Sequence, residues 1–313
     1  MKVYIETDIE GVAGFCFEAT RLPQPEQAEY SRTIARLLTA EVNAAVEGAF
    51  EAGATEIVVH DGHGTGYNIL VEELPPDVQI CHGLSAWQPN WQAGLDRSFD
   101  AVIGVGGHVM KDTNGITPHT LFLVNDTLRL GEFHMTAALA GWLGIPFLFA
   151  SGDGALGVQL RSLVPGIEYV AVKEALSPYY ARSLAPRKVR GLIRDGVSRA
   201  IRRRAEIAPF RLPFPPPFKV NVLGSDYQDP RAIVTGDDFW EVVMKVLETI
   251  YFYDLVRRDP WPLAPGGPIL NRHQIMAAQK RSRAAAGTPP RKAPGTPPRK
   301  SPGTPPRTPR PKN

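Results

Sequence analysis

An uninterrupted apolar strand constrains the fold of this chain more than any other feature. Residues 56–61 read Glu-Ile-Val-Val-His-Asp, with three apolar residues in a row and no polar alternation. Such a strand suits the centre of a sheet, where both faces are buried. A shorter β-branched and aromatic strand is predicted at residues 2–5. Between the two, residues 23–52 carry apolar side chains three and four positions apart, which predicts one long helix. A strand, a helix and a strand in this order indicate a parallel sheet.

The same alternation continues to about residue 160. Residues 101–105 and 145–150 read as further buried strands, and residues 133–142 predict a helix between them. The predicted fold class is therefore α/β, with a mostly parallel sheet flanked by helices. Residues 1–160 are expected to form the first domain.

Residues 161–278 predict a second, smaller α/β domain. Its expected elements are two strands and two helices, at residues 167–172, 218–223, 187–206 and 237–258. Asp237 or Asp238 is the expected cap of the last helix. This region contains no run of histidines and carboxylates, so it is expected to supply pocket walls and subunit contacts.

Residues 279–313 differ in composition from the rest of the chain. Residues 280–313 contain ten Lys and Arg and no acid, whereas the preceding residues contain 25 bases and 32 acids, a net charge of −7. Gly-Thr-Pro-Pro-Arg-Lys-Ala-Pro at residues 287–294 recurs eight residues later with Ser301 in place of Ala293. Such a segment cannot build a core, so a disordered Pro/Arg-rich tail is predicted. Weak binding to nucleic acid or another anionic surface and simple solubilisation both stay open as its role.

Other features of the sequence indicate the cellular compartment of the protein. The first apolar run is too short for a signal peptide, and no run approaches the ~20 apolar residues of a spanning helix. The two cysteines, Cys16 and Cys81, have no metal-ligand spacing and are expected to be free thiols in a reducing cytoplasm. A cytoplasmic protein without membrane association is therefore predicted.

Two acids follow the first predicted strand. Asp8 and Glu10 are two residues apart, so in an extended chain their side chains point the same way. Carboxylates this close repel each other, and a bound cation is a common way to keep both ionised. The alternative is a surface strand end with two solvated acids.

Potential metal ligands follow the later strands as well. His63 comes after the second predicted strand, His108 after the third, and His119 eleven residues further on, while Glu132 opens the next helix. Ligands of open parallel sheets bind outside the carboxyl ends of the strands, so these side chains are expected to converge. Imidazole and carboxylate without thiolate suit zinc, manganese or cobalt. Five or six such ligands are too many for one tetrahedral zinc and suit two ions that share a carboxylate.

The other histidines have simpler interpretations. His60 lies within a predicted strand and is interpreted as a packed core histidine. His82, His134 and His273 lack acidic partners in the sequence and are not expected to be ligands.

Several short motifs together resemble the zinc-dependent D-aminopeptidase family of bacterial dipeptide-transport operons. The resemblance covers about residues 1–275. It rests on Asp8-Ile9-Glu10-Gly11, Asp61-Gly62-His63, Gly107-His108 with His119, Gly131-Glu132, and Pro-Phe-Leu-Phe-Ala-Ser-Gly-Asp at residues 146–153. The interval between His119 and Glu132 is shorter than expected of the family, and the Pro/Arg-rich tail has no counterpart in it.

The resemblance implies a two-domain α/β protein with two zinc ions in each active site. It implies that Asp8 bridges the metals and that His119 is the catalytic imidazole. The remaining ligands implied by the resemblance are Glu10, His63, His108 and Glu132. It also implies a ring-like homodecamer that encloses its active sites.

The predicted function is a metallo-aminopeptidase that hydrolyses short peptides, with D-amino acids at the N-terminus as candidate substrates. Two alternatives stay open. The same ligand set also serves dinuclear amidases and phosphoesterases, although no phosphate-cradling glycine loop is recognisable. The second alternative is a binding protein that contacts nucleic acid or acidic partners through its basic tail.

Overall fold

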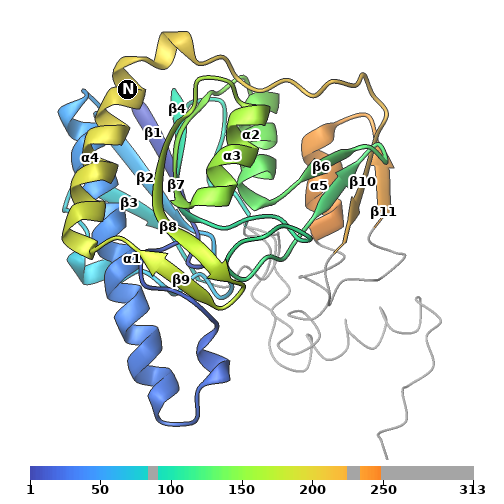
Figure 1. The fold of residues 1–313 in the computed structure, drawn as a ribbon. Coiled ribbons are helices and arrows are strands. Elements are labelled where there is room, and N and C mark those ends of the chain that lie inside the picture. The colour runs from blue at the N-terminus through green and yellow to red at the C-terminus, as the bar shows by residue number, and fades with distance from the viewer. Residues whose placement is uncertain (84–90, 224–232, 248–313) are drawn as a thin grey trace, which may run out of the picture. The chain divides into compact units, whose positions relative to one another are not determined.

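The computed structural model describes residues 1–83, 91–223 and 233–247 of the 313-residue chain (Figure 1). Its larger sheet has seven strands in the order β3-β2-β1-β4-β7-β8-β9. These strands are β1 (Lys2–Thr7), β2 (Glu56–Asp61), β3 (Val78–Cys81), β4 (Ala101–Gly107), β7 (Phe147–Asp153), β8 (Glu168–Ser177) and β9 (Tyr180–Ser183). All neighbours pair in parallel except β8 and β9. The predicted α/β class with a mostly parallel sheet is confirmed.

The strand order reverses direction between β1 and β4. From β1 the chain adds β2 and β3 on one side, and then crosses over to place β4, β7 and β8 on the other. Thr7 at the end of β1 pairs with both Asp61 of β2 and Val105 of β4. The residues that follow these three strands therefore start side by side, at the switch point where open parallel sheets bind their ligands.

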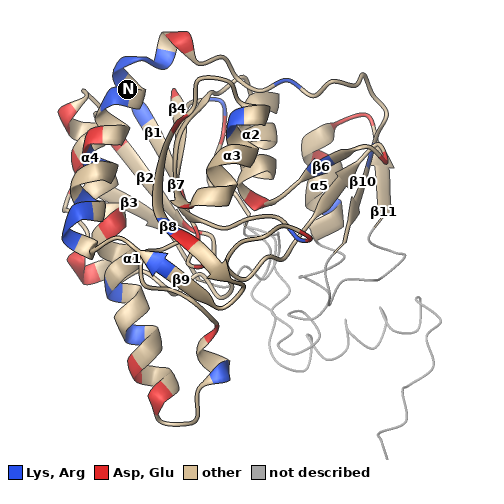
Figure 2. Cartoon of the chain, in the orientation of Figure 1, with Lys and Arg blue, Asp and Glu red and all other residues tan. Residues whose placement is uncertain are grey.

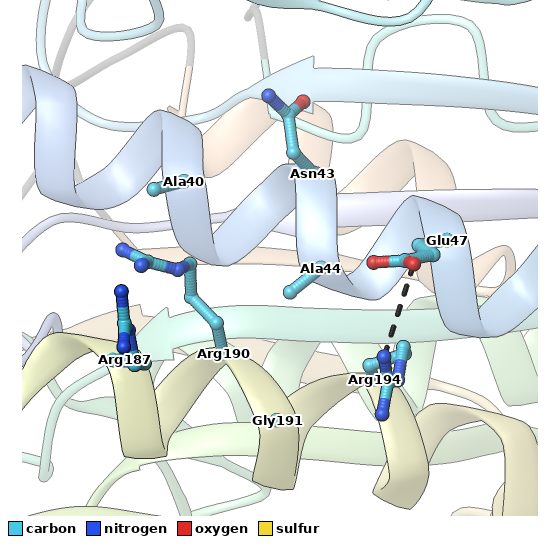
Figure 3. A pocket seen from close by; sticks show the side chains of 8 residues that line it. All are labelled: Ala40, Asn43, Ala44, Glu47, Arg187, Arg190, Gly191 and Arg194. Carbon is cyan, nitrogen blue, oxygen red and sulfur yellow. Dashed lines mark ion pairs between the residues drawn. The ribbon is translucent and has the colours of Figure 1, made fainter.

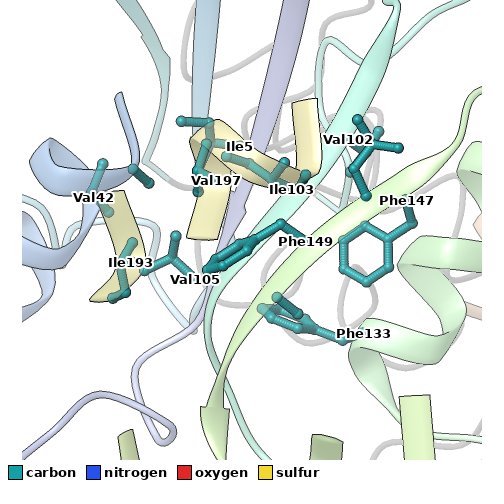
Figure 4. Packing of buried hydrophobic residues seen from close by; sticks show 14 of the residues in the cluster. Ile5, Val42, Val102, Ile103, Val105, Phe133, Phe147, Phe149, Ile193 and Val197 are labelled. Atoms are coloured by element: carbon teal, nitrogen blue, oxygen red, sulfur yellow. The ribbon is translucent and has the colours of Figure 1, made fainter. Parts of the chain in front are cut away.

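Helices cover both faces of this sheet. The helix α1 (Glu26–Glu51) packs against α4 (Pro186–Arg202), while α2 (Glu132–Trp142) and α3 (Gly154–Leu163) contact β4, β7 and β8 from the opposite face. Figure 4 shows Ile103 and Phe149 on the side of α1 and α4, and Phe147 on the side of Phe133 from α2. Short 3-10 helices lie at Ala19–Arg21 (η1), Val71–Glu73 (η2) and Arg204–Glu206 (η3).

A smaller antiparallel sheet has its own hydrophobic cluster. Its order is β11-β10-β5-β6, formed by β5 (Phe122–Val124), β6 (Leu128–Leu130), β10 (Phe218–Val222) and β11 (Ile233–Gly236), with α5 (Phe239–Leu247) packed on it. The Asp238 side chain accepts the backbone N–H of Glu241 at 3.0 Å, which confirms the predicted cap. The predicted continuation of this helix to residue 258 lies outside the described residues.

The two sheets do not divide the chain at residue 160. β8, β9 and α4 follow this position and yet belong to the seven-stranded sheet, whereas β5 and β6 precede it and belong to the smaller one. Periodicity identifies a strand but not the partner with which it pairs. The predicted disordered tail, residues 279–313, lies outside the described residues. Within the described part of the chain, no helix combines the length and apolarity needed to cross a bilayer.

Candidate metal centre

Six polar side chains gather at the switch point of the larger sheet. Asp8 and Glu10 follow β1, His63 follows β2 and His108 follows β4. Glu132 is the first residue of α2, and His119 lies in the loop between β4 and β5. Asp8, Glu10 and His108 are buried, whereas the side chain of His119 is 41% exposed. The cluster is therefore closed at its floor and open at His119.

Close backbone contacts bring the loops after β1 and β4 together. The Asp8 N–H donates to Val105 O at 2.9 Å, and the Gly11 N–H donates to Gly106 O at 2.7 Å. A Cβ added at Gly11 would lie 2.0 Å from Gly107 O, and one at Gly106, whose φ is +83°, would lie 2.1 Å from Asp8 O. Only glycine fits at these two positions, because any side chain would separate the loops that carry the acids and His108.

The acids contact the imidazoles directly. Asp8 Oδ2 lies 2.6 Å from Nδ1 of His108, and Asp8 Oδ1 lies 3.4 Å from Nδ1 of His63. Glu10 Oε2 lies 3.1 Å from the same His63 nitrogen. Asp8 therefore lies between the two histidines.

Glu132 and His119 lie on the other side of His108. Glu132 Oε1 is 3.9 Å from Nε2 of His108 and 3.6 Å from Nε2 of His119. His119 Nε2 is also 3.7 Å from Glu10 Oε1, and its ring stacks on that of His108 with centroids 4.0 Å apart and an interplanar angle of 3°.

Three overlapping groups in this cluster have a geometry that can hold a cation. In each group the ligand atoms lie within 4.8 Å of one another: Asp8, Glu10 and His63; Asp8, His108 and Glu132; and Glu10, His108 and His119. Asp8 belongs to the first two groups. The structure thus brings together all six side chains that were predicted to form one site.

The donor atoms fit a divalent metal. Among the described residues, the buried atoms His108 Nε2 and Glu10 Oε2 have no hydrogen-bond partner, although His63 Nδ1 lies near the latter. Burial lowers the pKa of the His108 imidazole, but the charges of Asp8, Glu132 and Glu10 and the hydrogen bond with Asp8 together outweigh it and raise the pKa to about 10. Burial also lowers the pKa of the His63 imidazole, but the charges of Glu10 and Asp8 and the hydrogen bonds with both together raise it well above its usual value. Three carboxylates in a buried site thus attract positive charge, and oxygen and nitrogen donors of this kind suit zinc.

The backbone around His119 holds its ring in one tautomer. His119 Nδ1 lies 2.8 Å from Thr117 O, a carbonyl that can only accept, so Nδ1 carries a proton, and Nε2 faces Glu10 and Glu132. Thr117 and Thr120 adopt positive φ angles of 41° and 52°. β-branched residues rarely do so, and such strain is concentrated at functional sites.

Lys173 supports the acids and was not singled out from the sequence. Its buried ammonium donates to three carbonyl oxygens: those of Glu10, of Val12 at 3.0 Å and of Phe15 at 2.7 Å. These bonds use all three donors of a lysine. The available signal was a single lysine within the otherwise apolar run Tyr-Val-Ala-Val-Lys at residues 169–173.

Two aspartates hold the loops that carry the histidines. Asp61 accepts the backbone N–H groups of Asn68 at 2.6 Å and Ile69 at 3.0 Å, which closes the loop that contains His63. Asp153 accepts the N–H of Ile116 at 2.8 Å, in the loop that contains His119. Both aspartates occur in the motifs noted above, but the sequence did not reveal that they act on loops rather than on a metal.

The remaining described histidines belong to none of the three groups. His60 is buried in β2 with its Nδ1 2.8 Å from Glu6 Oε2, which confirms its interpretation as a core histidine. His82 stacks on Tyr67, and His134 is buried in α2. His273 lies outside the described residues.

Three comparisons found known proteins that are similar to this chain. A D-aminopeptidase family model matches residues 1–240. A D-aminopeptidase from Bacillus subtilis (strain 168) is 27% identical over 244 residues, which cover 76% of this chain and 87% of that protein. Among solved structures, the Zn-dependent D-aminopeptidase DppA from Bacillus subtilis, described as a self-compartmentalizing protease, matches with a TM-score of 0.69. It is 22% identical, and the match covers 84% of this chain and all of the other, so it shows a shared fold.

Proposed function

We propose, from the premise that the chain belongs to the D-aminopeptidase family, that its six-residue cluster is the active site of a metal-dependent aminopeptidase. The observation that carries the proposal is the pair of acid and imidazole groups that share Asp8. One ion would be held by Asp8, Glu10 and His63, and a second by Asp8, His108 and Glu132. Zinc is the proposed metal, because the solved relative is Zn-dependent, with manganese or cobalt as substitutes.

The reaction proposed is hydrolysis of the first peptide bond of a short peptide. The bound ions would supply Lewis acidity that polarises the scissile carbonyl and acidifies the attacking water. Nε2 of His119 faces the cluster, so in the neutral imidazole this nitrogen can accept the proton of the water and return it to the leaving amine. The hydrogen bond of Nδ1 to Thr117 keeps the ring oriented during both transfers.

Glu18 is the proposed contact for the free amino group of the substrate. Its segment lies between a Phe17–Tyr30 ring stack and the contact of Arg21 with Tyr179, which lies 3.9 Å away. Burial raises the pKa of the Glu18 carboxyl, and the nearby charge of Glu10 raises it further. The charges of His63, His119 and Asp8 also act on this carboxyl, and Glu18 belongs to none of the three metal groups. A carboxylate at this position would favour substrates with an N-terminal ammonium.

The proposal also covers the oligomeric assembly of the protein and its cellular compartment. Because the solved relative is described as self-compartmentalizing, we propose that this chain also forms a closed homo-oligomer, with a ring-like decamer as the specific form. A cytoplasmic location is supported by two cysteines that form no disulfide. Short peptide substrates agree with an enclosed site.

The decisive experiment combines elemental analysis of the purified protein with hydrolysis assays on paired peptides that differ only in a D- or L-residue at the N-terminus. We expect two metal ions per chain and cleavage of the D-series. Amides with a blocked N-terminus and phosphodiesters serve as negative substrates. Preferential hydrolysis of phosphodiesters, or full activity in metal-free protein, would contradict the proposal.

A further inference from the structure

The helix α4 carries unpaired positive charge at its first turns. Arg187, Lys188 and Arg190 follow its start at Pro186, and its first turn contains no acid. The amino end of a helix is the positive end of its dipole and disfavours cations. At the favoured carboxyl end, by contrast, Arg199 pairs with Glu168 at 2.7 Å. The charges at the amino end therefore lack the compensation that those at the carboxyl end have, and Figure 2 shows Lys and Arg along this helix.

These charges line a groove between α1 and α4. The groove has a volume of about 440 Å³ and includes Arg187, Arg190 and Arg194 from α4. Figure 3 shows the side chains of Arg187 and Arg190 directed towards α1. The groove is open to solvent and is formed by helices, not by the strand ends that carry the metal centre.

Of the residues that the structure describes, Glu47 is the only acid that lines the groove, and it is already paired. Its Oε1 lies 3.9 Å from Arg194, which also contacts Asp195 at 3.1 Å. Within residues 1–83, 91–223 and 233–247, Arg187 and Arg190 form no ion pair. In this part of the chain, two guanidinium groups thus have no anionic partner.

The floor of the groove is empty because it consists of small residues. Ala40 and Ala44 lie on the α1 side and Gly191 on the α4 side. A Cβ added at Gly191 would meet no atom within 4 Å. Glycine within a helix lowers its stability relative to alanine, and no neighbouring atom in the described structure requires it here. The space is therefore available to a ligand.

We propose that this groove binds a phosphate group through Arg187 and Arg190. The planar guanidinium fork matches the spacing of phosphate oxygens and donates two parallel hydrogen bonds. The double negative charge of a phosphate balances the two unpaired guanidinium groups, and the amino end of α4 adds a favourable dipole. The site is separate from the peptidase centre and does not depend on the function proposed for that centre.

Calorimetric titration of the full-length protein with inorganic phosphate, pyrophosphate and AMP tests the proposal. We expect the wild-type protein to bind at least one of these probes at physiological ionic strength. The double variant Arg187→Gln/Arg190→Gln should bind that probe at least about tenfold more weakly. The matched control, Arg199→Gln/Arg203→Gln, removes two arginines that pair with Glu168 at the carboxyl end of α4, where Arg203 is the C-cap residue, and should bind as the wild type does. Phosphate and AMP distinguish a free anion from a phosphorylated metabolite as the source.

A second variant tests the groove itself. Gly191→Met adds a side chain to the open floor and should weaken phosphate binding while the melting temperature stays the same or rises. Unchanged peptidase activity and circular dichroism would show that each variant is folded. Absence of binding of all three probes to the wild type, or equal binding by wild type and Arg187→Gln/Arg190→Gln, would overturn the proposal. Binding of an acidic peptide or of a second copy in place of the phosphates would do the same.

Discussion

The metal centre and the groove between α1 and α4 both concentrate charges of one sign, but in opposite surroundings. In the metal centre, Asp8 and Glu10 are buried at strand ends and are surrounded by imidazoles. In the groove, Arg187 and Arg190 lie on a helix surface that water can reach. A charge interacts far more strongly in a buried site than beside water. The buried cluster therefore requires compensating groups within the protein, whereas the groove tolerates unpaired charge until a ligand arrives.

The supporting contacts reflect this difference. Lys173 and Asp153 each bond to backbone groups of loops that carry the buried cluster. The arginines of the groove need no such contacts, since a helix backbone already positions them. Function in the metal centre therefore depends on distant residues, and in the groove on the facing surfaces of α1 and α4.

Of the changes that should affect the two sites differently, removal of the metal is expected to have the largest effect. A strong chelator is expected to abolish peptidase turnover, and zinc should restore it. The free energy of unfolding should fall by about 3 kcal/mol, because a ligand at 100 times its dissociation constant stabilises by that amount. Scanning calorimetry and activity assays measure both. Phosphate binding in the groove should survive chelation, and its loss would show that the two sites are coupled.

Substitution of the proposed catalytic imidazole should have the next largest effect. His119→Ala is expected to lower kcat by about 10²- to 10⁴-fold, the range supplied by general acid–base catalysis. The metal content should not change, because Asp8, Glu10, His63, His108 and Glu132 remain to bind it. Steady-state kinetics and elemental analysis measure the two quantities. Retention of most activity would remove His119 from the mechanism.

Loss of the supporting lysine should destabilise the protein. Lys173→Met would leave three buried carbonyl groups without a donor, which is expected to cost ~4 kcal/mol of unfolding free energy. Metal affinity should also fall, because the segment next to Glu10 loses its anchor. Denaturant titration and metal competition test this, with the exposed Lys188→Met as the matched control. Equal stability of both variants would show that the segment holds its shape without Lys173.

A buried acid on α1 should make stability depend on pH. Burial raises the pKa of Glu41 from 4.5 to about 7, despite the hydrogen bond from Ala13 and the charge of Lys173. The folded state thus binds a proton that the unfolded state loses, so this group's contribution to stability falls as the pH rises from 4.5 to about 7. At about pH 8, Glu41→Gln should be more stable than wild type by up to ~3 kcal/mol.

Thermal unfolding at a series of pH values measures this effect. Below the unfolded pKa the wild type and Glu41→Gln should have equal stability, since Glu41 is then protonated in both states. Glu51→Gln, at the exposed end of the same helix, is the control and should change little at any pH. A constant difference between Glu41→Gln and wild type across the pH range would exclude titration of Glu41 as the cause.

Local patterns were sufficient to predict most elements and the members of the site. The apolar run before Asp61 and the helical periodicity before Gly53 depend only on neighbouring residues, and both elements formed where expected. Pairing was not predictable in the same way. β8 joins the sheet of β7, and β5 pairs with β10 almost a hundred residues later, because strand partners are chosen by packing across the whole chain.

The sequence by itself determined the chemistry of this protein. It placed acids and histidines directly after buried strands, and the residue types alone select a cation with oxygen and nitrogen ligands. Only the tertiary structure decided that Asp8 contacts both His63 and His108, that Lys173 reaches the carbonyl of Glu10, and that two arginines of α4 face an empty groove. Such contacts depend on strand order and helix packing, which bring together residues that no local pattern links.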